Sequence, residues 1–161
     1  FGWPKISTGD LLREAVRKQT PLGIEAKKSM DAGQLVPDAV VIGMVREKLG
    51  EPLCQKGFIL DGFPRTVPQA EELNRLLADR GLTLGRVINF RVTRDDVVKR
   101  LSGRRSCPKC QSVFHVDFAA PKISGQCDRC ATPLVQRSDD KPETIEASQR
   151  VYEEQTSPLI H

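Results

Sequence analysis

Residues that could take part in chemistry gather in two short stretches of this sequence. In the first, residues 57–61 form an apolar run that ends in Asp61 and leads at once into a glycine and proline loop carrying Arg65. An aspartate at the end of a buried parallel strand is well placed to hold the waters of a nucleotide-bound Mg²⁺, and a nearby arginine can bind a phosphate through two hydrogen bonds. The alternative interpretation is a strand followed by an ordinary turn.

The second stretch contains two Cys-x-x-Cys pairs separated by sixteen residues, Cys107 with Cys110 and Cys127 with Cys130. This spacing brings four thiolates around a tetrahedral Zn²⁺ and leaves no open coordination position, so the ion is expected to stabilise the fold and to take no part in catalysis. Two disulfides would need an oxidising compartment, and Fe²⁺ could bind the same four sulfurs. Cys54 lies apart and is interpreted as a buried or incidental thiol.

The hydrophobic periodicity predicts several helices around these stretches. Three short helices are expected before the first strand, one beginning near Thr8, one ending at Gly33 and one between Pro37 and Gly50. A last helix is expected to run to Ser157.

Two strands are predicted, at 57–61 and 86–92, and a helix that ends at Gly81 connects them. This order makes a parallel pair, but parallel strands need both faces covered and two of them are not stable alone. The sequence therefore predicts an α/β fold whose sheet is incomplete in this chain. Between 103 and 140 the helical periodicity gives way to cysteine, proline and glycine, which indicates an inserted subdomain.

Length and charge restrict the class of protein. A chain of 161 residues with a net charge of +4 fits one ordinary domain with a small insertion, and the mild basic excess suits a partner that carries phosphates. The sequence has no apolar run able to span a bilayer and no charged-then-apolar leader. We therefore expect a soluble protein in a reducing cytoplasm, with no membrane partner.

Three regions together resemble the adenylate kinase family. Residues 61–65 match its Asp-Gly-Phe-Pro-Arg motif, residues 6–13 resemble the start of its nucleoside monophosphate helix, and residues 137–140 with 155–159 resemble its lid-closing region. The cysteine pairs are similar to the lid of the zinc-bearing subgroup, in which His115 would be a lid-packing or nucleotide-facing residue. The family's Gly-x-x-Gly-x-Gly-Lys loop is not in the sequence, so we expect the chain to lack the strand and helix that carry this P-loop, and also the family's last strand and helix.

The resemblance implies a P-loop nucleoside monophosphate kinase-like fold, a parallel sheet flanked by helices with a zinc-binding lid at 103–140. The core would be 1–102 and 141–161, and it would include an AMP-binding subdomain at 7–36. The implied reaction is reversible phosphoryl transfer from ATP to AMP, which gives two ADP, in adenine nucleotide homeostasis. The implied cofactors are structural zinc and Mg²⁺ with ATP, and the implied protein is a monomer that binds no nucleic acid.

Site residues carry over by resemblance, position by position. Arg13 and Arg65 would bind the phosphate of AMP, Gln69 would read adenine, and Asp61 would organise magnesium. The implied catalytic residues are Asp61, Arg65, Arg104 and Arg137. The implied AMP-binding residues are Thr8, Arg13, Gln34, Leu35, Val36, Gly62, Phe63, Pro64, Arg65, Gln69 and Arg137. The implied ATP-binding residues are Arg100, Arg104, Val113 and Phe114, and the implied metal ligands are the four paired cysteines.

One position departs from the family pattern, and other functions stay open. Eleven residues after Arg137 the family has a second transfer arginine, where this sequence has Ser148. Such an arginine can contribute ~10³ or more in rate. With the P-loop missing as well, this stretch alone is expected to be inactive. One alternative is a zinc-ribbon module that binds nucleic acid, but the chain has few aromatic residues for such binding. The others keep the fold and change the nucleotide, to UMP or CMP as the acceptor or to GTP as the donor.

Overall fold

The computed structural model describes residues 2–160 and divides into two compact units. The first unit contains Phe1–Asn89 and Arg150–His161, and the second contains Phe90–Gln149. Each unit has packing of its own. These units are defined by packing, whereas the predicted domains, with boundaries near 102 and 141, are defined by function, and they stay a prediction.

Four α-helices make up most of the first unit, and three of them begin at a side-chain cap. The hydroxyls of Ser7, Thr20 and Thr66 accept hydrogen bonds from the backbone N–H three residues later, which satisfies a donor that would otherwise be unpaired at a helix start. The predicted helix start near Thr8 is thereby confirmed. The helices are α1 (Thr8–Arg17), α2 (Pro21–Asp31), α3 (Asp38–Leu49) and α4 (Val67–Ala78), with a 3₁₀ turn at Pro52–Lys56.

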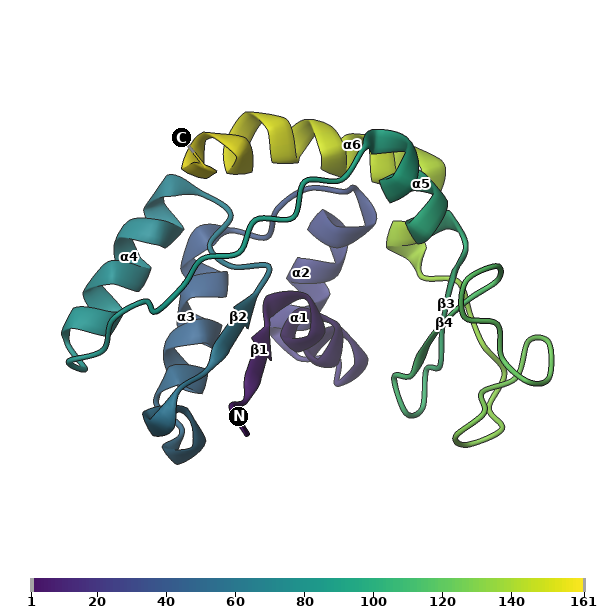
Figure 1. Ribbon diagram of the computed structural model, residues 1–161, viewed down its shortest axis with the longest axis horizontal. Helices are drawn as coiled ribbons and strands as arrows, with labels where there is room; N and C mark the ends of the chain where they lie inside the picture. The colour runs from purple at the N-terminus through teal and green to yellow at the C-terminus, as the bar shows by residue number, and fades with distance from the viewer. Residues whose placement is uncertain (1, 161) are drawn as a thin grey trace. The chain divides into compact units, whose positions relative to one another are not determined.

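A two-stranded parallel sheet lies among these helices (Figure 1), formed by β1 (Lys5–Ser7) and β2 (Ile59–Asp61). Its register pairs Ser7 with Asp61, so both strands end at the same edge. The strand at 57–61 is confirmed over its last three residues. Its partner β1 was not predicted, because a three-residue strand with only Ile6 buried gives no alternating pattern.

A single hydrophobic cluster holds the first unit together. Ala26 and Val45 are fully buried, and Leu73 is 2% exposed. The helices α1 and α2 pack closely at Gly23, where a Cβ would lie 2.1 Å from the carbonyl oxygen of Ala15.

The strand predicted at 86–92 is wrong. This segment is extended but has no ladder partner within residues 2–160, and Val87 and Ile88 are 82% and 75% exposed. A β-strand is defined by the hydrogen bonds that its backbone exchanges with a neighbour, and the apolar side chains of this run alone cannot supply one. The parallel pair therefore joins β2 to β1, and the predicted pairing of 57–61 with 86–92 does not form.

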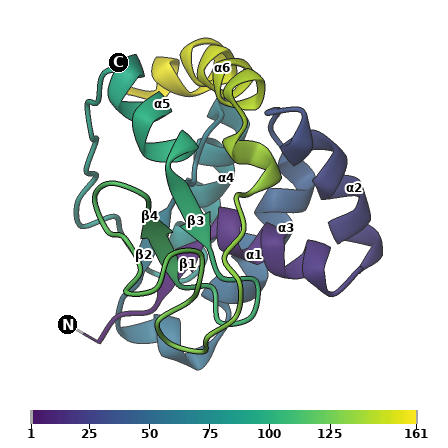
Figure 2. The same cartoon turned by 90° about the vertical axis from the view of Figure 1, so that its right-hand side faces the viewer.

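The second unit contains α5 (Arg94–Ser102), an antiparallel pair of β3 (Arg104–Ser106) and β4 (Val113–His115), and the beginning of α6 (Pro142–Val151). Irregular loops follow both strands (Figure 2). A 3₁₀ turn, Ser138–Asp140, precedes α6. After α6 the helical path continues as a π-turn at Tyr152–Thr156 and a 3₁₀ turn at Ser157–Ile160, which agrees with the predicted last helix.

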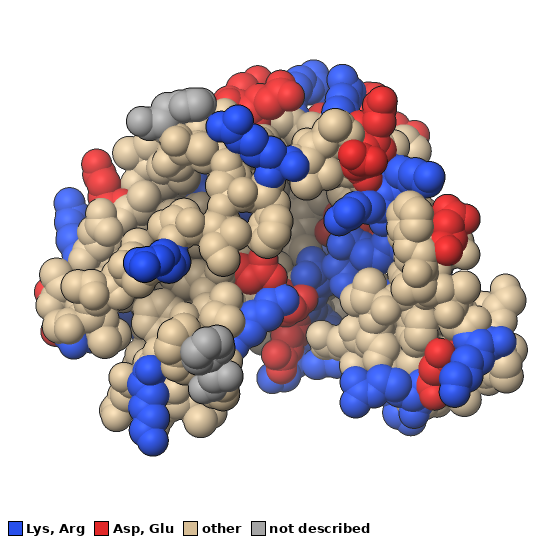
Figure 3. Space-filling model, in the orientation of Figure 1, with Lys and Arg blue, Asp and Glu red and all other residues tan. Residues whose placement is uncertain are grey.

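Charged side chains of both signs appear on the face of the molecule drawn in Figure 3, and neither sign forms an unbroken surface over either unit there. Among the described residues no helix is both long and apolar enough to cross a membrane.

Candidate functional site

The loop after β2 is organised by hydrogen bonds to the carbonyl oxygen of Gly62. The hydroxyl of Thr8 donates to this oxygen at 3.0 Å, and Nε of Arg65 donates to it at 3.1 Å. Gly62 has φ +72°, and a Cβ there would lie 3.2 Å from Nη2 of Arg65 and 3.4 Å from Oγ1 of Thr8. Glycine is therefore needed on two counts, the left-handed backbone and the close approach of these side chains.

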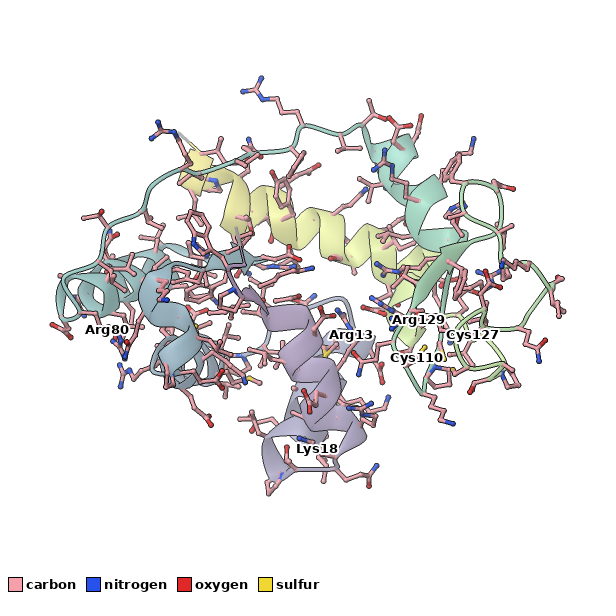
Figure 4. All side chains as sticks on the ribbon, turned by 60° about the horizontal axis from the view of Figure 1, so that its bottom comes forward. Arg13, Lys18, Arg80, Cys110, Cys127 and Arg129 are labelled. Atoms are coloured by element: carbon pink, nitrogen blue, oxygen red, sulfur yellow. The ribbon has the colours of Figure 1, made fainter. Side chains whose placement is uncertain are left out.

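Arg13 lies on α1, the helix that begins at Thr8 (Figure 4). A Cβ on Gly9 would lie 3.0 Å from its Nη2 atom, so the guanidinium lies directly over the first turn of the helix. Arg13 also donates to the carboxylate of Asp10 at 2.6 Å. Burial lowers the pKa of Arg65 from its ordinary value, and the positive charge of Arg13 adds to this effect while Asp61 opposes it. Two guanidinium groups that influence one another in this way make the region basic, which suits a phosphate.

Gln69 in α4 is 2% exposed, and its amide is bonded at both ends. Its Oε1 accepts from the backbone N–H of Arg65 at 2.8 Å, and its Nε2 donates to Asp38 at 2.7 Å. The carbonyl of Arg65 accepts from the hydroxyl of Thr156 at 2.9 Å. The backbone of Arg65 is thus held on both sides, by Gln69 of the following helix and by Thr156, which is 91 positions away.

Asp61 lies at the end of β2, as predicted, and is about half exposed. Its carboxylate forms an ion pair with Lys5 of the neighbouring strand at 2.8 Å, and this hydrogen bond raises the pKa of Lys5. Before α3, the turn at 34–36 has Val36 in the core at 5% exposure and Gln34 at the surface. Phe63 is buried at 6% exposure, and Pro64 follows it through a cis peptide bond.

In the second unit, two of the predicted arginines border β3. Arg104 binds the fully buried carboxylate of Asp140 through two hydrogen bonds, one of them from Nε to Oδ2 at 2.9 Å. Arg137 donates from Nε to the hydroxyl of Ser106 at 2.8 Å. Arg100 is exposed on α5, and Ser148 is exposed on α6. The predicted ATP contacts Val113 and Phe114 both lie in β4.

The four cysteines lie together, with all their sulfurs within 4.8 Å of one another. The closest pairs, Cys107 with Cys130 and Cys110 with Cys127, have Sγ atoms 3.4 Å apart, and Figure 4 labels the second pair. A tetrahedral site with metal–sulfur distances of ~2.3 Å has edges of about 3.8 Å between sulfurs, so this cluster fits such an ion with small adjustments.

The two cysteine loops have the same local construction. Cys107 donates its N–H to Ser112 at 2.9 Å, and Cys127 donates to Thr132 at 2.9 Å. In each loop the residue after the second cysteine has a positive φ, 61° at Gln111 and 57° at Ala131. Hydrogen bonds with Ser112 lower the pKa of Cys110 to about 6, and burial raises the pKa of Cys127 to about 11. A divalent cation stabilises all four thiolates, and it would remove this difference.

His115 packs inside the second unit at 8% exposure. Its Nδ1 accepts from the backbone N–H of Asp117 and of Phe118, and its ring stacks on that of Phe118 with centroids 4.3 Å apart. His115 is thus a packing residue of the second unit, and no imidazole nitrogen belongs to the sulfur cluster.

Comparison with known proteins identifies the family of the chain that carries these two sites. The family model described as "Adenylate kinase" matches residues 1–161. The chain belongs to the adenylate kinase family. A protein described as adenylate kinase from Citrifermentans bemidjiense is 56% identical over 160 residues, which are 99% of this chain and 75% of that protein. Those from Carboxydothermus hydrogenoformans and Archaeoglobus fulgidus are 54% and 53% identical, and the match covers 99% of this chain and 74% of each.

Membership in the adenylate kinase family confirms the predicted fold class, an α/β nucleoside monophosphate kinase-like fold with an incomplete sheet, and the predicted enzyme class, the phosphotransferases. It does not favour the zinc-ribbon alternative. The structure brings Thr8 and Arg65 to the carbonyl of Gly62, with Arg13 close enough to influence Arg65, and it brings Arg104 and Arg137 to one strand of the second unit. Their roles, and those of the other predicted site residues, remain proposals.

Sequence reasoning missed two residues that contact the predicted site, Asp38 and Lys5. Asp38 follows Pro37 in what reads as an ordinary helix start, and its partners Thr66 and Gln69 are 28 and 31 positions away. Lys5 precedes a single buried residue and carries no motif. Nothing in one sequence signals either contact.

Proposed function

We propose that the residues of this chain serve the adenylate kinase reaction, the reversible transfer of a phosphoryl group from ATP to AMP with formation of two ADP. The observation that carries the proposal is the convergence of Thr8 and Arg65 on the carbonyl oxygen of Gly62, with Arg13 close enough for its charge to lower the pKa of Arg65. Phosphoryl transfer needs little covalent work from the protein, so positioned cations and hydrogen-bond donors can supply most of the rate enhancement. Family membership supports the same nucleotides, ATP, AMP and ADP.

On the AMP side, Arg13 and Arg65 would bind the phosphate, with Gly62, Phe63 and Pro64 forming the loop beneath it. Thr8 holds that loop through the Gly62 carbonyl, and Gln69 fixes the backbone of Arg65. The turn at 34–36 would contact the nucleoside. The support for these roles is the match to the family motif together with the hydrogen bonds that make the loop rigid.

On the donor side, Arg100 and Arg104 would contact ATP, with Val113 and Phe114 from β4, and Arg137 would bind phosphate. Arg104 is held by Asp140, so a phosphate oxygen would share or replace that carboxylate. Asp61 would organise the waters of Mg²⁺. When bound, this ion would neutralise charge on the ATP phosphates. Lys5 would then have to release the Asp61 carboxylate.

For the metal centre, we propose zinc with a structural role in a lid formed by 103–140. The four cysteines supply a complete set of soft ligands for a tetrahedral ion, and they come from the two hydrogen-bonded cysteine loops. Such a site has no open coordination position for a substrate. Iron suits the same donors, so metal analysis of the purified protein, by mass spectrometry of its metal content, decides between them.

Calorimetric titration of the metal-loaded chain with AMP tests the proposal most simply. We expect a saturable heat with one AMP per chain, weaker binding of CMP and UMP, and no comparable heat with a single-stranded oligonucleotide. Binding of UMP or CMP in preference to AMP would favour the pyrimidine kinase alternative. Absence of any AMP heat would contradict the proposal. A monomeric state, a cytoplasmic location and the choice of ATP over GTP stay predictions.

A further inference from the structure

Asp38 connects the two helices that border the proposed AMP site. It is the first residue of α3, and each of its carboxylate oxygens accepts one hydrogen bond from the beginning of α4. Oδ2 accepts from the hydroxyl of Thr66 at 3.0 Å, and Oδ1 accepts from Nε2 of Gln69 at 2.7 Å. The position suits an anion, because the free N–H groups at a helix start carry partial positive charge.

These contacts leave the amide of Gln69 only one orientation. A carboxylate only accepts hydrogen bonds, so Asp38 requires the nitrogen end of the amide. The backbone N–H of Arg65 only donates, so it requires the oxygen end, and it lies 2.8 Å from Oε1. A flipped amide would place an N–H against a donor and an oxygen against the carboxylate, and at 2% exposure water cannot repair those contacts.

Within residues 2–160, these two bonds leave one N–H and one lone pair of the amide without a partner, in a set order. This order matters for a purine base. Adenine has an amino donor at position 6 beside an acceptor at N1, whereas hypoxanthine has a carbonyl acceptor at position 6 beside a donor at N1. An amide that could turn over would serve either base, but an amide held in one orientation serves only one of them.

We propose that Asp38 is a specificity-determining, positioning residue, which selects a 6-aminopurine over a 6-oxopurine by holding Gln69 in one orientation. The inference rests on the proposed function, because it needs a purine nucleotide at this site. Asp38 acts through Gln69 and touches no nucleotide itself. Asp38 also restrains Arg65 indirectly, since the Gln69 oxygen that binds the Arg65 N–H cannot turn away.

The test is the ratio of the affinities for AMP and IMP, measured by calorimetry on the metal-loaded chain. Asp38→Ala removes the restraint, so we expect the AMP-to-IMP ratio to fall by about tenfold, the effect of losing one hydrogen bond to a charged group. Asp38→Asn can present either an oxygen or an N–H to Gln69, and its ratio should lie between those of Asp38→Ala and the wild type. If Asp38→Ala does not fold, Asp38→Asn carries the test alone.

The matched control is Asp95→Ala, which removes an acidic residue from the first turn of α5 and should leave the ratio unchanged. A purely structural role of Asp38 would weaken AMP and IMP equally, so an unchanged ratio in the variant that folds would overturn the inference. Failure of the wild-type chain to bind AMP would instead contradict the proposed function.

Discussion

The two units of this protein are stabilised by different means. The first unit has a hydrophobic cluster that includes Ala26, Val45 and Leu73, and its candidate site is set in loops that this cluster supports. In the second unit α5 has no buried residue, and the burial around the strands involves Cys107, Cys127, Ser106 and His115. The comparison teaches that one region can keep its site rigid through packing and polar contacts, whereas the other, with the proposed structural metal, would depend on that ion for the same rigidity.

Removal of the metal should have the largest effect, and it should act on the second unit and not on the first. Structural zinc in small domains contributes about 10 kcal/mol or more of folding free energy, so a chelator that strips the metal should unfold the cysteine loops. Hydrogen exchange should show rapid loss of protection at the N–H groups of Cys107 and Cys127, while Val45 in the first unit keeps its protection. Unchanged exchange at both cysteines after proven metal loss would show that the metal is not structural.

The reverse experiment destabilises the first unit and leaves the second unit intact, by creating a cavity in the hydrophobic cluster. Leu73 is 2% exposed in the hydrophobic cluster, so Leu73→Ala should lower the free energy of unfolding of this unit by about 2–5 kcal/mol. Denaturant unfolding measures this loss. Metal affinity, measured by competition with a chromogenic chelator, should not change. Leu53→Ala is the matched control, because Leu53 is 72% exposed and its removal should cost little.

The site of the first unit can be tested by replacing one of its arginines with lysine. Arg65→Lys keeps the charge but removes the planar group that binds phosphate through two hydrogen bonds, so AMP affinity should fall by about 10- to 100-fold. Calorimetry with AMP gives the value, and Arg80→Lys at the end of α4 serves as the control. If Arg65→Lys lost no more affinity than Arg80→Lys, Arg65 would contribute only general positive charge.

The smallest expected effect concerns pH. Partial burial of Asp10 works to raise its pKa, but the hydrogen bond and charge of Arg13 outweigh it and lower the pKa below the ordinary value of 3.8. A depressed pKa stabilises the folded state above pH 3.8, and this contribution is lost as the pH falls through the lower folded-state pKa. Because the pair is partly exposed, Asp10→Asn should cost less than ~1 kcal/mol at pH 7. The cost should vanish in denaturant unfolding at low pH, and persistence there would assign it to something other than the ion pair.

Local signals predicted much of this structure. The helix start near Thr8, the end of the strand at Asp61 and the paired cysteines depend on residues close together in sequence, and all three are present. The strand at 86–92 was wrong because its apolar side chains indicate burial but do not say which neighbour would pair with it. The bonds of Asp38 to Thr66 and Gln69 depend on how α3 meets α4, which no short pattern encodes.

Titration of the metal-loaded, isotope-labelled chain with AMP, followed by backbone amide NMR, tests the central claim most directly. The account predicts that the largest shifts fall at Gly62 and Arg65, with smaller ones at Thr8 and Arg13, and that they saturate together. Saturable shifts confined to the cysteine loops, or no shifts at all in the loop after β2, would contradict it.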